Sequence, residues 1–284
     1  MSTVGLIVGN DPKALTAWKK LTGINPAWFL LAYGESGPQE LSDNGPWMAQ
    51  LSTAFRKLPG AQAGIFSVPL LRGKLEEIVA GRHDGLYRKI ATELLSAYAD
   101  SRYRIDIRIG WEGNGDFNAN VARNAAGKWS PALWVDAYKQ IVGVYRSVSP
   151  RFRFTWCPNY GNQGVDPCLL WPGPDYADIV ALDAYLSGAW AKTGSGRAMV
   201  AGVHGLQWGA DFAAMNGKPF ALGEWGMDSD MLVPEFRYVA DWLNGLGPHL
   251  IYQNWWNRPE VFDCRLERLP RMLGAFKAAF GNTA

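Results

Sequence analysis

The sequence predicts an α/β protein of the (β/α)8 class, the TIM barrel. The chain of 284 residues contains eight short, apolar, β-rich segments, and amphipathic helical patterns or long connections separate most of them. It has no internal repeat, low-complexity tract or change of composition that would mark a linker. Strands that alternate with helices form a parallel sheet, because parallel pairing needs a crossover connection. We therefore expect one (β/α)8 domain over residues 1–284.

The eight candidate strands are runs of apolar residues that end in polar or glycine-containing segments. In chain order they cover residues 4–8, 28–33, 64–68, 103–109, 152–156, 179–182, 220–222 and 250–253. A doubly wound open sheet would show the same alternation, so the count does not exclude it. That alternative lacks its usual ligand signature, since the first strand runs into IVGNDPKALT without a Gly-rich phosphate loop.

Five helices are predicted between or after these strands. The strongest begins after Ser130, a good N-cap, with Pro131 at the first helical position and apolar residues at helical spacing as far as Tyr145. Others are expected at 86–98, 205–215 and 235–243, the second of them closed by Asn216 and Gly217. The last, at 266–280, contains Pro270, which should break it.

Charge and hydropathy exclude two classes of partner. The net charge is +2, from 28 basic and 26 acidic residues with no long block of one sign, which argues against nucleic acid. No apolar run reaches membrane-spanning length, so we expect no membrane insertion. The compartment stays open: secreted or periplasmic if a signal peptide was removed, otherwise cytoplasmic. A monomer is expected.

Cysteine and histidine usage argues against a disulfide framework and a metal site. The three cysteines cannot all pair, and buried free thiols are expected, although a bridge between Cys157 and Cys168 stays open. The three histidines are isolated in sequence, and no HExxH pattern or carboxylate cluster accompanies them. We therefore expect no metal and no cofactor.

Two glutamates lie where a barrel carries its chemistry, at the carboxyl ends of strands. In RYRIDIRIGWEGNGDFN the isoleucines alternate with Arg104, Asp106 and Arg108, so an extended chain would direct Arg108 and Glu112 toward the barrel mouth. In KPFALGEWG, Glu224 follows an apolar run. Cleavage of a glycosidic bond needs two such carboxyl groups, one to protonate the leaving oxygen and one to attack or to activate water. The alternative for Glu112 is a solvated loop residue or an ion pair with Arg108.

The chain also contains 14 Trp, and a tryptophan needs a partner for its N–H or a ligand for its face. Most should lie in the core. Trp111, Trp225, Trp255 and Trp256 are the exceptions, because they follow predicted strands beside the two glutamates. They are candidate stacking platforms for a sugar.

These motifs resemble those of glycoside hydrolase family 26, which includes β-mannanases. The family pattern Arg-x-x-His-Glu-x-Asn-Gly is matched by residues 108–115, RIGWEGNG, at every fixed position except the histidine, which is Trp111 here. Residues 178–185 resemble the family's Asp-x-x-x-x-Asp-x-Tyr, and PFALGEWG resembles the segment that ends in the nucleophile.

The resemblance implies a retaining, endo-acting hydrolase of a β-linked polysaccharide. It implies Glu112 as the acid/base, Glu224 as the nucleophile and Tyr185 as the hydroxyl that orients Glu224. It further implies that Arg108 and Asn114 hold the carboxylates and a sugar hydroxyl, with sugar contacts from the residues Asn159 and Asp183 and stacking by Trp255 or Trp256.

Two departures from the family lie where substrate would bind. One is Trp111, and the other is Asp116-Phe117-Asn118, which replaces the aromatic stretch that usually follows Asn-Gly. They leave open whether the substrate is mannan-like or another β-linked polymer, for example a bacterial exopolysaccharide. An inactive carbohydrate-binding barrel is the alternative from another class, and transglycosylation would use the same residues.

Overall fold

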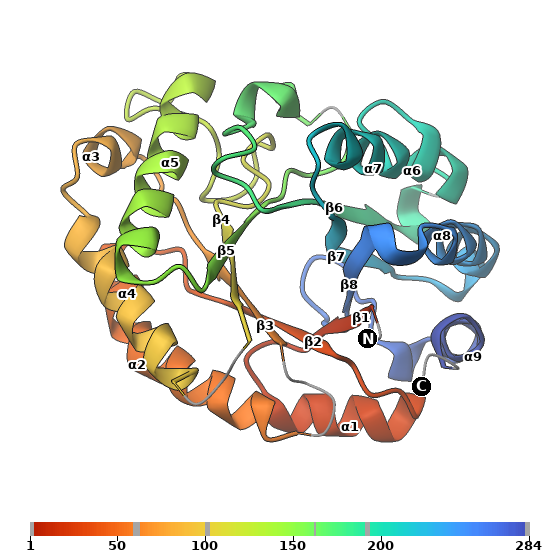
Figure 1. The fold of residues 1–284 in the computed structure, drawn as a ribbon. Coiled ribbons are helices and arrows are strands. Elements are labelled where there is room, and N and C mark those ends of the chain that lie inside the picture. The colour runs from red at the N-terminus through yellow and green to blue at the C-terminus, as the bar shows by residue number, and fades with distance from the viewer. Residues whose placement is uncertain (1–2, 59–62, 100–102, 162, 191–193, 282–284) are drawn as a thin grey trace.

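The strands of the computed structural model close into a barrel, which confirms the predicted fold class. The structure describes residues 3–58, 63–99, 103–161, 163–190 and 194–281. Eight parallel strands pair in sequence order, and the last pairs with the first (Figure 1). They are β1 Val4–Ile7, β2 Trp28–Ala32, β3 Ala63–Val68, β4 Ile105–Ile109, β5 Phe152–Trp156, β6 Ile179–Leu186, β7 Phe220–Met227 and β8 Leu250–Trp256.

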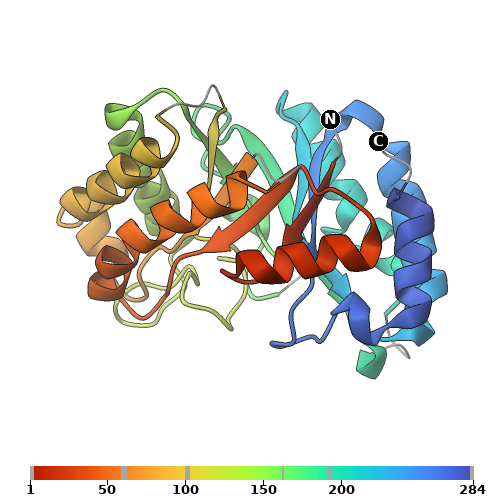
Figure 2. The same ribbon diagram turned by 90° about the horizontal axis from the view of Figure 1, so that it is seen from below.

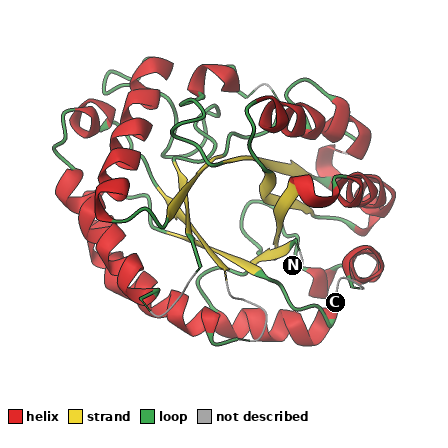
Figure 3. Ribbon diagram, in the orientation of Figure 1, coloured by secondary structure: helices red, strands yellow, loops and turns green. Residues whose placement is uncertain are grey.

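Helices surround the ring of strands (Figure 3). They are α1 Pro12–Thr22, α2 Pro38–Arg56, α3 Leu75–Val79, α4 Asp84–Ala97, α5 Pro131–Val148, α6 Gly196–Ala201, α7 Leu206–Met215, α8 Val233–Gly245 and α9 Pro270–Phe280. The five predicted helices correspond to α4, α5, α7, α8 and α9, and Pro270 does separate a short 3-10 turn from α9. The prediction missed the short helices α3 and α6 and also α1 and α2, which lie along the outside of the first strands (Figure 2). Gly45 and Pro46 interrupt the helical pattern of α2.

The barrel has an outer and an inner core. On β4 the side chains of Ile105, Ile107 and Ile109 face outward into the layer between strands and helices, as the alternation predicts. Each such buried side chain contributes about 1.5–3 kcal/mol. A smaller apolar cluster fills the inside of the barrel and includes Leu30 and Ile65. The inside of the barrel is therefore packed and is not an open pore.

The carboxyl ends of the strands differ from the prediction in two ways. The strands β6, β7 and β8 run four, five and three residues beyond their predicted ends at 182, 222 and 253, so Asp183, Tyr185, Glu224 and Trp256 belong to strands. The strand β4 instead ends at Ile109, and the expectation of extended chain as far as Glu112 is wrong. Gly110 and Glu112 have φ of 54° and 56°, so the backbone turns there.

The cysteines are free, and no described helix is long and apolar enough to cross a membrane. Cys157 and Cys264 are buried, as expected for structural thiols. Cys168 is exposed, so the expectation of burial is wrong for that residue, and the open alternative of a bridge to Cys157 is not formed.

Candidate active site

A buried arginine organises the polar cluster at the carboxyl end of β4. The guanidinium of Arg108 donates from Nη1 to both oxygens of Asp183, at 2.9 and 2.7 Å, and from Nη2 to Glu224 Oε1. Its Nε donates to Ser67 Oγ at 2.9 Å. Because this planar group is fully buried and bonded along each edge, it fixes the positions of both carboxylates.

Glu224 lies on β7, and both of its carboxylate oxygens are hydrogen-bonded. Arg108 bonds Oε1, and the hydroxyl of Tyr185 donates to Oε2 at 2.6 Å. Burial raises the pKa of Tyr185, so its phenol stays protonated and keeps donating. The ring of Phe262 stacks on Tyr185 with centroids 5.0 Å apart. These contacts fix the orientation of the Glu224 carboxylate.

Glu112 has a different environment. Two amides donate to it, Asn159 Nδ2 to Oε1 at 2.5 Å and Asn118 Nδ2 to Oε2 at 3.2 Å. Burial raises its pKa to about 7, the negative charge of Glu224 adds to the rise, and the hydrogen bond from Asn159 opposes it. Glu112 therefore holds its proton near neutral pH. Its backbone is in the left-handed region, a strained conformation that is often found at functional sites.

Asn114 acts on Asn159 and not on either carboxylate. Its Nδ2 donates to the backbone oxygen of Asn159 at 2.9 Å, and its Oδ1 accepts from the backbone nitrogen of that residue at 2.8 Å. Asn114 is buried with no exposed surface. It positions the amide that bonds Glu112, and it does not hold a sugar hydroxyl as the sequence led us to expect.

A glycine makes the close approach of these groups possible. A Cβ on Gly223 would lie 2.5 Å from Asp183 Oδ1 and 2.6 Å from Cys157 Sγ. The strand register also shifts beside it, between Leu222 and Trp225 on the β8 side. Such irregularities redirect side chains, and here the Glu224 side chain points to Arg108.

The acidic groups of the cluster outnumber its single basic group. Asp183 and Glu224 share one guanidinium, and Glu112 lies near enough for the charge of Glu224 to raise its pKa. A fourth carboxyl group, Glu35, accepts from the backbone nitrogen of Ala119 at 3.2 Å. Burial raises the pKa of Glu35, Arg108 lowers it and Glu224 raises it, so Glu35 also borders the cluster. Protonation of one acid lowers the repulsion between the carboxylates. The protonated form is the one that a general acid requires.

The four candidate tryptophans lie on different sides of the barrel wall. Trp256 is partly buried at the mouth, with its ring 6.0 Å from that of Tyr185. Trp111 packs in the inner core, and the Arg108 guanidinium lies 5.1 Å from its ring. Trp225 and Trp255 have no exposed surface and pack outward against α8 and α9. The assignment of Trp225 and Trp255 to sugar binding is therefore wrong, because inward and outward positions alternate along a strand.

Four residues at or beside the site were missed from the sequence: Glu35, Ser67, Asn118 and Phe262. Ser67 could have been found, because it lies on the inward row of β3 and pairs in register with Arg108. Asn118 and Phe262 come from loops, where no periodic pattern indicates direction.

Two of the three histidines, which are isolated in sequence, have acidic neighbours in space. His83 Nε2 lies 3.0 Å from Glu77 Oε2, and His204 Nε2 lies 3.6 Å from Asp166 Oδ1. Asp166, Cys168 and His204 place three potential metal-ligand atoms within 4.8 Å of one another. This group is separate from the carboxylate cluster, and Asp166 already accepts from the backbone nitrogen of Cys168.

With this geometry established, the chain can be compared with known proteins. No family model matches the sequence, and no curated protein does. Several solved structures are similar to the chain. An endo-β-1,4-mannanase double mutant from Cellulomonas fimi has a TM-score of 0.73 and 18% identity over 99% of this chain and 71% of its own.

Two further structures are similar to the chain. A mannanase from Bacillus subtilis has a TM-score of 0.62 and 18% identity, over 94% of this chain and 85% of its own. A glycoside hydrolase family 26 β-mannanase from Bacteroides ovatus has a TM-score of 0.59 and 13% identity, over 99% of this chain and 88% of its own. At these identities the likeness shows a common fold.

Proposed function

We propose that this chain is a retaining, endo-acting glycoside hydrolase that cleaves a β-linked polysaccharide. The observation that carries the proposal is the contrast between two carboxyl groups in one buried cluster. Glu112 accepts from two amides and has a pKa raised to about 7, whereas Arg108 and Tyr185 bond both oxygens of Glu224. Two carboxyl groups with divergent environments are what an acid and a nucleophile require.

In the proposed reaction, a carboxylate oxygen of Glu224 attacks the anomeric carbon while Glu112 transfers its proton to the departing glycosidic oxygen. A glycosyl ester on Glu224 and a shortened glycan result. Glu112, now ionised, takes a proton from water as that water attacks the anomeric carbon, which releases the sugar and restores both groups. Arg108 and Tyr185 hold the Glu224 carboxylate in position, and Asn159 holds Glu112.

The mannanase-like folds of the compared structures support a β-mannan as the first substrate to test. Trp111 and residues 116–118 differ from the family pattern and lie beside the cluster, so β-glucans, β-xylans and bacterial exopolysaccharides belong in the same panel. Trp111 offers one N–H and an aromatic face where a histidine would offer two ring nitrogens.

The test measures release of reducing ends from each polymer by the wild type, Glu224→Gln and Glu112→Gln. A matched control is Glu77→Gln, because Glu77 belongs to a surface pair with Lys74. Release that is lost in both site variants and kept in the control supports the proposal. Binding of a polymer by folded wild type without any release would instead assign the chain to carbohydrate recognition.

A further inference from the structure

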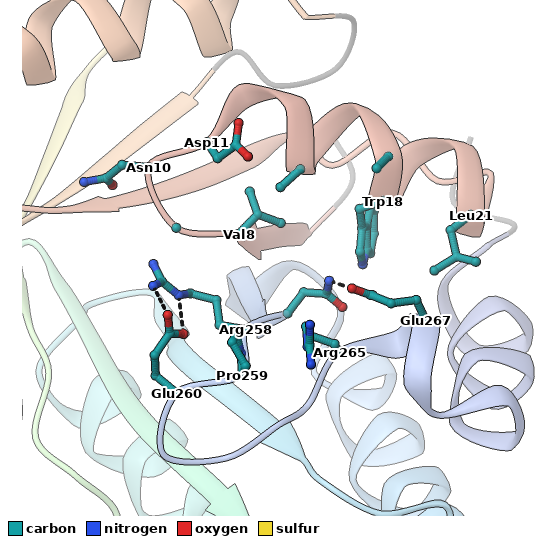
Figure 4. Close-up of a pocket in the computed structure, with 14 residues that line it drawn as sticks. Val8, Asn10, Asp11, Trp18, Leu21, Arg258, Pro259, Glu260, Arg265 and Glu267 are labelled. Carbon is teal, nitrogen blue, oxygen red and sulfur yellow. Dashed lines mark hydrogen bonds and ion pairs between the residues drawn. The ribbon is translucent and has the colours of Figure 1, made fainter.

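A cavity of about 660 Å³ lies beside the carboxyl ends of β1 and β8. This volume is within the range of small-molecule sites. The wall formed by α1 is apolar and includes Ala14, Ala17 and Leu21, whereas residues 257–267 after β8 supply a polar wall opposite (Figure 4). A ligand that fits here needs both an apolar face and hydrogen-bonding groups.

The α1 wall contains one polar atom that lacks a partner. Trp18 is 2% exposed, and its Nε1 has no hydrogen-bond partner among the described residues. In Figure 4 this nitrogen points from α1 toward the wall that carries Arg265 and Glu267. A buried donor left unsatisfied costs about 1–3 kcal/mol, so an acceptor oxygen of a ligand would be favoured at this position.

Both arginines of the lining already pair with a carboxylate, and its other acidic side chains accept hydrogen bonds, so no cation is left for an anionic ligand. The pairs are Arg258 Nε to Glu260 Oε2 at 2.7 Å, Arg265 Nε to Asp263 Oδ1 at 2.8 Å, Asn257 Nδ2 to Glu267 Oε2 at 3.2 Å, and the backbone nitrogen of Lys13 to Asp11 Oδ1 at 2.8 Å. An anionic ligand would have to break one of the two arginine–carboxylate pairs.

Trp256 connects the cavity with the carboxylate cluster. The Arg258 guanidinium lies 5.6 Å from the ring of Trp256, which is 6.0 Å from the ring of Tyr185, the residue that donates to Glu224. The pKa of Arg258 is raised mainly by its bond to Glu260 and in smaller part by the charge of Glu224. One extended ligand could therefore contact both places.

We propose that this cavity is a subsite for a neutral sugar unit of a glycan that also occupies the mouth of the barrel. A pyranose has apolar C–H faces for the α1 wall and hydroxyl oxygens that accept from Trp18 Nε1. This inference rests on the proposed function for the class of ligand. It adds a recognition element formed by α1 and the segment after β8.

The test measures binding in a Glu224→Gln background, where turnover is removed. Mannotriose, mannohexaose, cellohexaose and xylohexaose are titrated by calorimetry into the parent, into Trp18→Phe and into Ala17→Phe. Trp18→Phe removes the donor and keeps an aromatic ring against Phe276, and Ala17→Phe fills the cavity from an exposed position. Trp242→Phe is the control, since its N–H bonds Gln207 on the outer surface.

We expect Trp18→Phe to weaken binding of the best hexasaccharide about 3- to 10-fold, as for loss of one neutral hydrogen bond. Ala17→Phe should weaken it more, and the control should not change it. Unchanged affinity in both cavity variants, or no binding of any glycan to the folded parent, would overturn the subsite. Release of reducing ends by the wild type reports on the proposed function separately, so either inference can fail while the other stands.

Discussion

Two buried arginine–carboxylate groups lie inside the barrel, and they differ in charge balance. Near the amino ends of the strands, Arg153 donates from Nε and Nη2 to the two oxygens of Asp106, both at 2.7 Å. Here one cation meets one carboxylate. At the carboxyl ends, Arg108 alone meets two carboxylates, Asp183 and Glu224. The lower pair is matched one to one, as a structural ion pair would be. The upper cluster holds more acidic groups than its arginine can pair with, which stability alone does not require.

The largest expected effect separates the two groups by activity. Glu224→Gln should lower kcat by at least about 10³-fold, because it removes the proposed nucleophile. The same change should leave the melting temperature unchanged or raised, since Arg108 keeps Asp183 and the cluster loses surplus charge. Reducing-end assays and scanning calorimetry measure the two quantities. A large fall in melting temperature would show that the upper cluster is a structural ion pair like the lower one.

The second effect is on stability at the lower pair. Asp106→Asn should lower the free energy of unfolding by about 2–4 kcal/mol, because it leaves the guanidinium of Arg153 largely buried without its counter-charge. Urea unfolding measures it, and kcat should stay within about twofold of wild type. Asp116→Asn is the matched control, since Asp116 also bonds an arginine in a two-point contact but lies on the surface. Equal destabilisation by both variants would contradict the argument from burial.

The third effect concerns pH and Glu112. The acid must be protonated, so kcat/KM should fall as pH rises through about 7, the raised pKa of this residue. The stability of the fold should change in the same direction. The folded state binds the Glu112 proton more tightly than the unfolded chain does, so Glu112 contributes stability below pH 4.5. This contribution is lost as pH rises to about 7. Glu112→Gln should remove this part of the pH dependence of unfolding.

Asn159→Ala sharpens the same prediction. The bond from Asn159 lowers the pKa of Glu112, so its loss should move the alkaline limb of kcat/KM to higher pH by up to about one unit and reduce kcat about tenfold. Asn244→Ala is a control, because Asn244 bonds a backbone oxygen at the outer surface. A limb that moves to lower pH would refute the assigned role of Asn159.

How far the sequence predicts the site depends on whether a residue lies in a regular strand. Period-two alternation directs Arg108 inward, and the same rule applied from Glu224 would have directed Trp225 outward. Alternation could not place Glu112, because the chain turns at Gly110 before reaching it. It also could not reveal that Asn114 bonds the backbone of Asn159, a contact between residues 45 positions apart. Such contacts depend on how two loops meet, and no local pattern records that.

The smallest effect compares two hydroxyls that flank Arg108 in the strand register, Ser67 on β3 and Thr155 on β5. Ser67 Oγ accepts from Arg108 Nε at 2.9 Å, whereas Thr155 Oγ1 lies 3.3 Å from the hydroxyl of Tyr252. Both are fully buried. Ser67→Ala and Thr155→Val should therefore each cost about 1 kcal/mol of unfolding free energy.

Only Ser67→Ala should also lower kcat, about 2- to 10-fold, because it frees one edge of the guanidinium that holds Glu224. The measurements are urea unfolding and initial rates on the best polymer. Equal rates for the two variants would mean that the carboxylates alone hold Arg108 in place. A slower Ser67→Ala enzyme at equal stability would show that the position of this cation, and not the packing of the barrel around it, limits the proposed reaction.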